Sequence, residues 1–355
     1  MCGIVGFIGE GGESDILEMI GALRHRGPDG SGHYVDENTS VFLGHTRLAI
    51  VDLANGAQPM CIDNEELTIV YNGEIYNQLE LRCELERLGH QFFSINSDTE
   101  VVLRGWKEWR HELLEKLNGM FAFAVYDKVG KTLTLARDRF GEKPLFWARQ
   151  NGRFLFSSEV SAIVETHRFD KRVDTLSLKK FFAYGYVPAP GCIFEDCFKL
   201  EPGHTLEFDL TNGKVTQQSF WTYRIEPEYE GRNERELEEE LRSLVEEATQ
   251  KRMLSDVPIG VFLSGGLDST IVLSYMTNGM SQQPINSFSI GFDRGTFDES
   301  NYAREAAEYF GANFNIKMFS MKDAIPQATK KLPLLDEPIS DPSFLPTHML
   351  CELQK

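Results

Sequence analysis

Cysteine occupies position 2, directly after the initiator methionine, and this placement is the strongest chemical signal in the chain. We expect Met1 to be removed before so small a residue, which leaves Cys2 with both a thiol and a free α-amine. A thiol titrates near pH 8.5 and an α-amine at about pH 7.7 to 8.0, so at neutral pH the amine is partly unprotonated and can accept the thiol proton. This nucleophile needs no histidine. The alternative is a small residue that simply follows the start codon.

A second chemical signal is the run Ser-Gly-Gly-Leu-Asp-Ser-Thr at residues 264–270, between the apolar stretches 259–263 and 271–276. A strand, a glycine turn and a helix in immediate succession direct backbone N–H groups and the hydroxyls of Ser264, Ser269 and Thr270 toward one point above a helix N-terminus. The run is neither a Walker loop nor a Rossmann fingerprint. It has the form of a pyrophosphate loop, which cleaves ATP between its α and β phosphates to adenylate a substrate. The alternative is a glycine-rich connection without function.

Two differently patterned halves must position these groups. Up to about residue 210, short apolar runs recur between turn signals and predict strands, at 4–8, 41–43, 67–71, 121–126, 133–136 and 154–156. An amphipathic helix is predicted at 79–88. Asn233 followed by Glu236 then predicts a helix start, with an apolar stripe after it. We therefore expect an α+β domain at 1–215, a linker at 216–232, and at 233–355 an α/β domain with a parallel sheet, whose second strand is 287–291.

Composition limits the partners and the compartment. The 355 residues include 54 acidic and 36 basic side chains, a formal charge of -18, which disfavours nucleic acid and anionic membrane as partners. The sequence contains neither an export signal nor an apolar stretch long enough to span a membrane, so we expect a cytoplasmic protein with reduced thiols. Cys192 and Cys197 lack a second ligand pair for a metal. We expect them, and Cys61, Cys83 and Cys351, to be small buried side chains.

Four short polar motifs accompany Cys2 and the glycine loop. They are His-Arg-Gly-Pro-Asp-Gly at 25–30, Arg-Leu-Ala-Ile-Val-Asp at 47–52, Tyr-Asn-Gly-Glu-Ile-Tyr-Asn at 71–77 and Ser-Asp-Thr-Glu at 97–100. With these motifs in this order, the whole chain resembles the glutamine-hydrolysing asparagine synthetases. The resemblance implies a class II glutamine amidotransferase domain with the four-layer αββα fold of N-terminal-nucleophile hydrolases. It also implies a synthetase domain of the adenine nucleotide α-hydrolase type.

The resemblance implies roles for residues of the first domain. Cys2 would attack the glutamine amide, and Asn72 and Gly73 would stabilise the oxyanion. Glutamine would be bound by Arg47, Ile50 and Val51 at its carboxylate and by Glu74 and Asp98 at its ammonium. Each assignment has a local alternative. Asn72-Gly73 is also a hairpin dipeptide, Asp98 lies in a capping box formed by Ser97 and Glu100, and Arg47 could form a surface ion pair. We expect Arg26 to gate the pocket or to shape its loop, and residues 137–145 and 158–159 to have a structural role in ordering the interface between the two domains.

For the second domain the resemblance implies an ATP site with Mg²⁺. The residues expected to bind ATP are Leu263, Ser264, Gly265, Gly266, Asp268, Ser269, Thr270 and Ile290, with Asp268 as the magnesium-linked acid. This domain would activate a carboxylate, most simply that of aspartate, as an acyl-adenylate, and ammonia delivered through an apolar tunnel would form asparagine. Such an enzyme is a C–N ligase with glutamine as amide donor. A homodimer is compatible with this assignment.

The chain departs from the family near its end. Family members continue through a second glycine-acidic loop and a lysine that help to bind ATP, so we expect a competent glutaminase domain joined to an incomplete synthetase core. The alternatives are an amidotransferase of the same architecture with a sugar or peptide acceptor, a glutaminase-only fragment, and a non-catalytic regulatory relative. A lone ATP pyrophosphatase is disfavoured, because it would require neither Cys2 nor the Asn72-Gly73 cluster.

Overall fold

The structure, a computed structural model, describes residues 1–355 except 54, 65, 167, 226–230, 280–283, 294–297 and 355. It separates into two compact units. The first contains Met1–Arg224 and Asp336–Ile339, and the second contains Ile225–Leu335 and Ser340–Lys355. Part of the expected linker, residues 226–230, lies outside the described residues. Across the described ranges, no helix has the length and apolar character needed to cross a bilayer.

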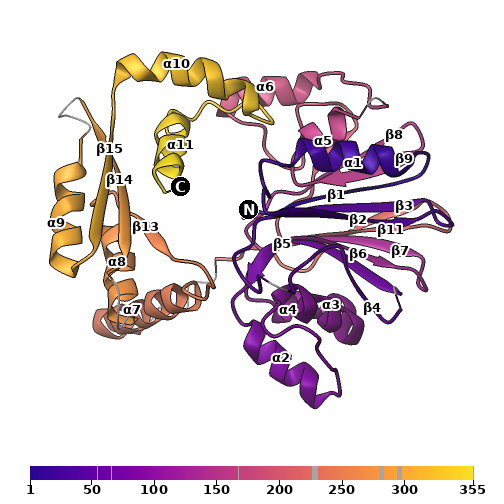
Figure 1. The fold of residues 1–355 in the computed structure, drawn as a ribbon, viewed down its shortest axis with the longest axis horizontal. Coiled ribbons are helices and arrows are strands. Elements are labelled where there is room, and N and C mark those ends of the chain that lie inside the picture. The colour runs from indigo at the N-terminus through magenta and orange to yellow at the C-terminus, as the bar shows by residue number, and fades with distance from the viewer. Residues whose placement is uncertain are drawn as a thin grey trace. The chain divides into compact units, whose positions relative to one another are not determined.

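Two six-stranded antiparallel sheets form the middle of the first unit (Figure 1). One sheet contains, in spatial order, β10 (Cys197–Lys199), β8 (Phe146–Gln150), β9 (Arg153–Ser157), β1 (Gly3–Ile8), β3 (Val41–Arg47) and β2 (Gly30–Asp36). The other contains β12 (Val215–Ser219), β11 (His204–Asp209), β7 (Thr132–Arg137), β6 (Gly119–Asp127), β5 (Leu67–Ile75) and β4 (Met60–Ile62).

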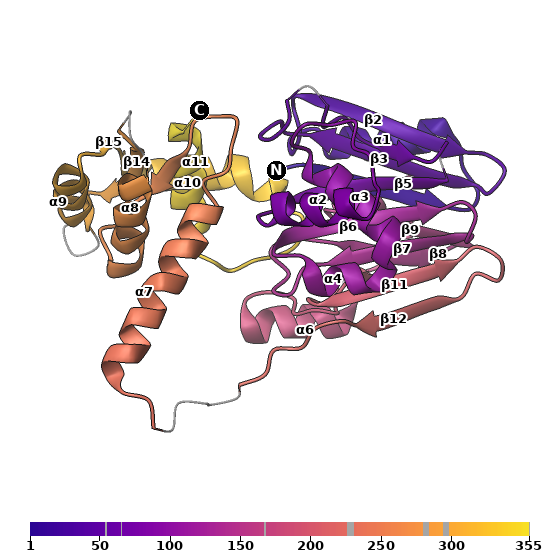
Figure 2. The same ribbon diagram turned by 90° about the horizontal axis from the view of Figure 1, so that it is seen from below.

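Helices cover the outer faces of the two sheets. The first sheet carries α1 (Glu13–Ala22) and α5 (Ser161–Val164), and the second carries α2 (Gln78–Arg87), α3 (Asp98–Trp109) and α4 (Leu113–Lys116), which Figure 2 shows from below. The short 3-10 helix η1 (Arg110–Glu112) joins α3 to α4, and α6 (Thr175–Tyr184) follows α5. The order helix, sheet, sheet, helix confirms the predicted αββα fold.

The side chains of the central strands point alternately to the helix layer and to the space between the two sheets. Successive side chains of a strand point to opposite faces, so a strand between two layers must be apolar on both. In β1, Val5 and Phe7 pack toward α1 and α5, whereas Ile4 and Ile8 pack between the sheets. The same division separates the two faces of β6, where Phe121, Phe123 and Val125 pack in the core that includes α3 and Ala122, Ala124 and Tyr126 pack between the sheets. The apolar runs of the sequence therefore mark strands buried on both sides.

Three features of this unit differ from the sequence-based expectations. Asn72 and Gly73 lie inside β5 and pair with β6, so the hairpin-turn alternative is wrong. The strand β12 pairs with β11 and includes residues 216–219, which we assigned to the linker. Cys192 and Cys197 are buried as expected and Cys61 is half-buried, but Cys83, on α2, is exposed, as is Cys351 in the second unit.

The second unit contains a three-stranded sheet of β13 (Gly260–Phe262), β14 (Asn286–Phe292) and β15 (Asn313–Phe319). Both strand pairs are parallel, as predicted. Its helices are α7 (Glu234–Lys251), α8 (Leu267–Gly279), α9 (Ser300–Phe310), α10 (Met321–Lys331), η2 (Leu332–Leu334) and α11 (Phe344–Leu353). In Figure 1, α9 and α11 lie on opposite faces of the sheet. The predicted start of α7 is confirmed, because the side chain of Asn233 accepts a hydrogen bond from the Glu236 N–H at 2.9 Å.

The segment Asp336–Ile339 belongs to the first unit although the chain on both sides of it belongs to the second. The Asp336 carboxylate accepts hydrogen bonds from the backbone N–H groups of Val160 and Ser161 at the start of α5. The Glu337 carboxylate accepts from the Ile193 N–H at 3.0 Å and pairs with the Lys199 ammonium at 2.6 Å. These contacts fix a short, distant piece of chain in the first unit.

A buried carboxylate holds the loop that follows β7. Asp138 is 1% exposed, and its two oxygens accept hydrogen bonds from the backbone N–H groups of Phe121, Phe140, Glu142 and Lys143 at 3.0 to 3.2 Å. An ionised carboxylate accepts such bonds with both oxygens. Asp138 therefore has a structural role within the first unit.

Replacement of Asp138 by asparagine should destabilise the first unit by about 2 to 5 kcal/mol, because the amide group leaves two buried N–H groups without an acceptor. Urea unfolding followed by tryptophan fluorescence measures this loss selectively, since all 4 tryptophans, Trp106, Trp109, Trp147 and Trp221, lie in the first unit. The exposed Asp170→Asn variant is the control. Equal midpoints for the two variants would show that the carboxylate is dispensable.

Candidate functional site

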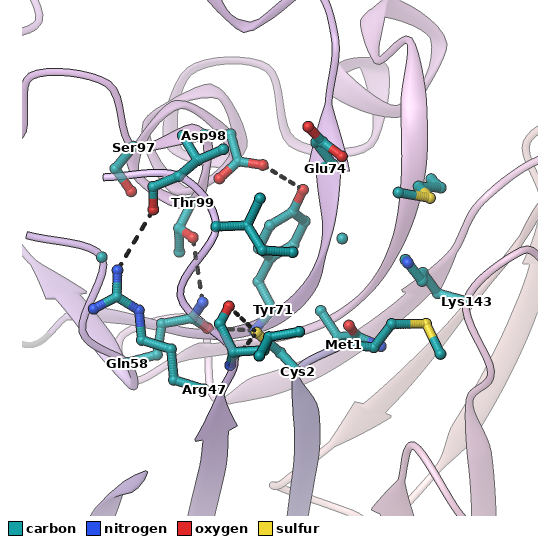
Figure 3. Close-up of a pocket in the computed structure, with 17 residues that line it drawn as sticks. Met1, Cys2, Arg47, Gln58, Tyr71, Glu74, Ser97, Asp98, Thr99 and Lys143 are labelled. Atoms are coloured by element: carbon teal, nitrogen blue, oxygen red, sulfur yellow. Dashed lines mark hydrogen bonds between the residues drawn. The ribbon is translucent and has the colours of Figure 1, made fainter. Parts of the chain in front are cut away.

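One pocket of the first unit brings together the residues predicted to act on glutamine. Its volume is about 160 Å³. Its lining includes every catalytic and glutamine-binding residue predicted from the sequence, namely Cys2, Arg47, Ile50, Val51, Asn72, Gly73, Glu74 and Asp98. They come from the chain start, the end of β3 and the loop after it, β5 and the start of α3 (Figure 3). Separate pieces of the sequence thus converge on Cys2.

The position of Cys2 is set by the pairing of β1 with β3. In this pair Gly3 lies opposite Thr46, which brings Cys2 beside the residues that follow β3. The Leu48 N–H donates a hydrogen bond to the Cys2 sulphur at 3.4 Å, and that sulphur is 3.6 Å from the Leu48 carbonyl oxygen. The Arg26 guanidinium donates to the Cys2 carbonyl oxygen at 2.9 Å and pairs with Glu159 at 2.6 Å. Arg26 therefore holds the backbone of the nucleophile.

Burial changes the protonation of both groups at the chain start. It raises the pKa of the Cys2 thiol, although the Leu48 N–H and the terminal charge oppose this effect. It lowers the pKa of the terminal amine, here that of Met1. A neutral amine beside a protonated thiol is the arrangement in which the amine acts as a base during attack. Among the described residues that line the pocket there is no histidine, so the terminal amine is the base that the geometry offers.

Asn72 presents an unused hydrogen-bond donor. It is 2% exposed, and its side-chain nitrogen has no hydrogen-bond partner among the described residues. A buried amide without a partner costs about 1 to 3 kcal/mol, so such a group is retained where a ligand can satisfy it. The next residue has to be glycine, because a Cβ on Gly73 would lie 2.4 Å from the Met120 carbonyl oxygen. The site therefore combines the buried N–H donor of Asn72 with a close approach of the Gly73 backbone to that of Met120.

Asp98 begins α3 and is held from β5. Its carboxylate accepts hydrogen bonds from the Tyr71 hydroxyl at 2.8 Å and from the Ile75 N–H at 3.2 Å. Burial raises the pKa of Asp98 despite these bonds, which indicates a carboxylate that a cationic ligand would stabilise. The alternative role in a capping box is not observed: the Ser97 side chain makes no capping bond, and Glu100 accepts instead from Ser94 and Arg104.

Arg47 is fixed by the loop that follows β3. Its guanidinium donates to the carbonyl oxygens of Asp52 at 2.6 Å and Leu53 at 3.1 Å. The lack of a side chain at Gly56 makes room for it, because a Cβ there would lie 2.4 Å from the guanidinium. Arg47 is thus held by backbone oxygens, and the surface ion pair weighed as its alternative role is not formed with any described residue.

Several further residues of the pocket had no role in the sequence-based prediction. Gln58 accepts from the Tyr71 N–H at 2.7 Å and donates to the Thr99 hydroxyl at 3.3 Å, linking the loop, β5 and α3. Met120 and Lys143 line the pocket as well. Tyr71 and Lys143 lie within segments that carried the resemblance, so only their contacts were missing. Gln58 had no sequence signal of its own.

The second unit places the predicted phosphate loop between β13 and α8. The Ser264 hydroxyl lies 3.0 Å from that of Ser269 and accepts from the Gly266 N–H at 3.2 Å. Gly265 has φ +83°, and a Cβ there would lie 2.5 Å from the Ala303 nitrogen, so both conformation and space demand glycine. The strand, turn and helix thus follow one another as predicted, with Thr270 in the first turn of α8.

The remaining ATP-site candidates surround this loop. Leu263 is buried and donates its N–H to the Phe288 carbonyl oxygen at 2.9 Å, and Ile290 lies two residues further along β14. Asp268 is exposed in the first turn of α8. No group of three or more His, Cys, Asp or Glu side chains in the described ranges is arranged to hold a metal. A single accessible carboxylate beside a phosphate loop suits Mg²⁺, which binds proteins through one or two carboxylates and substrate phosphates.

Comparison with known proteins finds a family match for each of the two parts of the chain. Residues 1–221 match the family model described as a glutamine amidotransferase domain, and residues 240–355 match the model described as asparagine synthase. A putative glutamine-hydrolysing asparagine synthetase 2 of Methanocaldococcus jannaschii is 35% identical, covering 100% of this chain and 72% of the relative. The glutamine-hydrolysing asparagine synthetase 1 of Bacillus subtilis is 33% identical, covering 100% of this chain and 56% of the relative.

A solved structure of glutamine phosphoribosylpyrophosphate amidotransferase from B. subtilis is 18% identical, with a TM-score of 0.45 over 89% of this chain and 65% of that one. The chain spans little more than half the length of the B. subtilis synthetase. The amidotransferase model covers most of the first unit, and the archaeal relative aligns with the whole chain at 35% identity. The chain therefore belongs to the family of glutamine-hydrolysing asparagine synthetases.

Proposed function

We propose that this protein hydrolyses glutamine at Cys2 and transfers the ammonia to a carboxylate activated by ATP, with aspartate as acceptor and asparagine as product. The observation that carries the proposal is the convergence of Cys2, the unpartnered Asn72 amide and the Asp98 carboxylate on one pocket. In this proposal residues 1–215 form the glutaminase domain and residues 233–355 form part of the synthetase domain.

Hydrolysis would begin with transfer of the thiol proton to the terminal amine, exposed on Cys2 once Met1 is removed. The thiolate attacks the glutamine side-chain carbonyl carbon, and the carbonyl oxygen becomes an oxyanion. The Asn72 amide and the Gly73 N–H donate hydrogen bonds to this oxyanion. As the C–N bond breaks, the amine returns its proton to the leaving nitrogen, and ammonia departs. Water then attacks the Cys2 thioester in the same way and releases glutamate.

The other end of glutamine is an α-carboxylate and an α-ammonium. Arg47 would pair with the carboxylate, with backbone groups at Ile50 and Val51, because a guanidinium offers parallel N–H donors. Glu74 and Asp98 would bind the ammonium. The raised pKa of Asp98 supports this role, since a bound cation favours the ionised form of a buried carboxylate.

In the second unit, Ser264, Gly265, Gly266, Ser269 and Thr270 would hold the ATP phosphates with backbone N–H and hydroxyl groups at the start of α8. Leu263 and Ile290 would contact the adenosine. Asp268 would bind Mg²⁺, which neutralises the pyrophosphate leaving group when it is present. The acceptor carboxylate is then activated as an acyl-adenylate, and attack by ammonia releases AMP.

Replacing Cys2 by alanine should lower glutaminase activity by at least about 1,000-fold, because Cys2 supplies the only thiol among the described residues that line the pocket. Glutamate release measures this activity. Mass spectrometry should also show that Met1 is absent and that a glutamine-analogue electrophile labels Cys2. The exposed Cys83→Ala variant is the control and should keep full activity. Retention of Met1 in an active enzyme would contradict the mechanism.

Replacing Asn72 by alanine should lower kcat for glutamine hydrolysis by about 10²- to 10³-fold with a much smaller change in KM, because the donor acts on the oxyanion. Alkylation of Cys2 by iodoacetamide develops no oxyanion, so its rate should stay close to that of the unmodified protein. An equal loss in both rates would assign Asn72 to support of Cys2 instead.

In the full-length gene product, glutamine, ATP, Mg²⁺ and aspartate should yield AMP and asparagine in equal amounts. Asp268→Asn should lower AMP formation by at least about tenfold, because the metal-linked carboxylate is lost, and should leave glutaminase activity intact. Glu246→Gln on the exposed face of α7 is the matched control. Glutamate without AMP would restrict the chain to a glutaminase, and AMP only with a sugar or peptide acceptor would replace aspartate.

A further inference from the structure

A lysine lies at the end of the glutaminase pocket where the chain begins. Lys143 is 6% exposed and lines the pocket together with Met1, Cys2 and Met120. In Figure 3 Lys143 lies on the same side of Cys2 as Met1, opposite Arg47. The mechanism proposed above assigns it no role. A buried lysine directed into a reaction pocket is costly unless its charge is used there.

The backbone of Lys143 is fixed from both sides. Its N–H donates to the Asp138 carboxylate at 3.0 Å, and its carbonyl oxygen accepts from the Arg137 guanidinium at 2.8 Å. Asp138 and Arg137 also hold Gly141 and its neighbours in the same loop. These bonds therefore hold the backbone of Lys143 at the edge of the pocket that its side chain lines.

The ammonium of Lys143 has no direct counter-ion among the described residues. It forms no ion pair within 4.0 Å of a carboxylate of any described residue. Burial and Arg26 lower its pKa, whereas the more distant carboxylates of Glu142, Glu74 and Asp138 raise it and support the charged form. Arg26 differs from Lys143 in this respect, because its guanidinium is paired with Glu159 at 2.6 Å.

Charged groups of both signs act on the terminal amine of Met1. Burial and the positive charges of Arg26 and Lys143 lower the pKa of this amine, whereas Cys2 and Asp29 raise it. The Asp29 carboxylate is itself engaged by the Ala49 N–H at 2.8 Å. Removal of Met1 moves the amine by one residue, about 3.8 Å, and leaves it in the pocket that Lys143 lines.

We propose that Lys143 is a positioning residue for glutamine hydrolysis: its ammonium keeps the terminal amine of mature Cys2 in the neutral form that accepts the thiol proton. The inference rests on the proposed glutaminase function. An ammonium near the amine repels its protonated form and leaves its neutral form unaffected. The amine can then take the thiol proton at neutral pH and return it to the departing ammonia nitrogen.

The test is the pH dependence of kcat/KM for glutamine in the protein lacking Met1. Activity rises with pH as the amine loses its proton, so this limb reports the amine. Lys143→Met should move the limb to higher pH by about 0.5 to 1 unit, a three- to tenfold loss at pH values below the limb, and should approach the unmodified rate at high pH. Lys143→Arg should restore the original limb. The rate of Cys2 alkylation by a glutamine analogue should shift in the same way.

Lys107→Met is the matched control, because this lysine pairs with Asp63 at the surface and does not line the pocket. An unshifted limb in Lys143→Met, or a shift that Lys143→Arg does not reverse, overturns the inference. A loss of equal size at every pH would assign Lys143 a structural role only. Absence of glutaminase activity in the unmodified protein would instead overturn the proposed function, so the two failures are distinguishable.

Discussion

The antiparallel pairing of β1 with β3 is the interaction on which the rest of the site depends. Chain termini are poorly ordered unless they are tied down, yet here the reactive residue stands next to the terminus. β1 lies between β3 and β9 in the sheet, and its side chains are buried on both faces. This pairing places Cys2 beside Leu48 and brings the loop after β3 to the nucleophile. The layered core thus provides the rigidity that a terminal nucleophile lacks.

Electrostatics then decides what that rigid site can do. Burial raises the pKa of the Cys2 thiol and lowers that of the terminal amine, so it favours the neutral form of both groups. A neutral amine is a base, and a buried thiol is protected from reaction until a substrate aligns with it. The unpartnered Asn72 amide and the buried Asp98 carboxylate, whose pKa is raised, likewise cost the empty site stability. Each is a group whose partner would be supplied by the substrate.

The sequence predicted the fold class and the residues that line the pocket. It did not predict the features that depend on contacts between distant parts of the chain. The apolar runs of β1 and β6 predict strands buried on both faces, because that property is local. The resemblance predicted which residues meet at Cys2. It did not distinguish a hairpin from a strand at Asn72-Gly73, since the dipeptide suits both until β6 is seen beside it. Gln58 contacts Tyr71 and Thr99, which lie in other segments of the chain, and Lys143 shares a pocket with Cys2, so neither position could be predicted from the local sequence. Cys83 was misjudged because the residue type alone does not reveal which face of a helix it occupies.

The location of Asp336–Ile339 has a consequence for how the protein can be divided. This stretch is a structural part of the first unit, yet it is encoded more than a hundred residues after Arg224. A protease that nicks the polypeptide once after Arg224 would leave a non-covalent complex, because Asp336 would still cap α5 and Glu337 would still bind Lys199. A gene fragment that ends at Arg224 would lack Asp336 and Glu337. The Ser161 and Ile193 N–H groups and the Lys199 ammonium would then have to bind water instead. The first unit is therefore discontinuous in sequence, and its boundaries cannot be given as one interval.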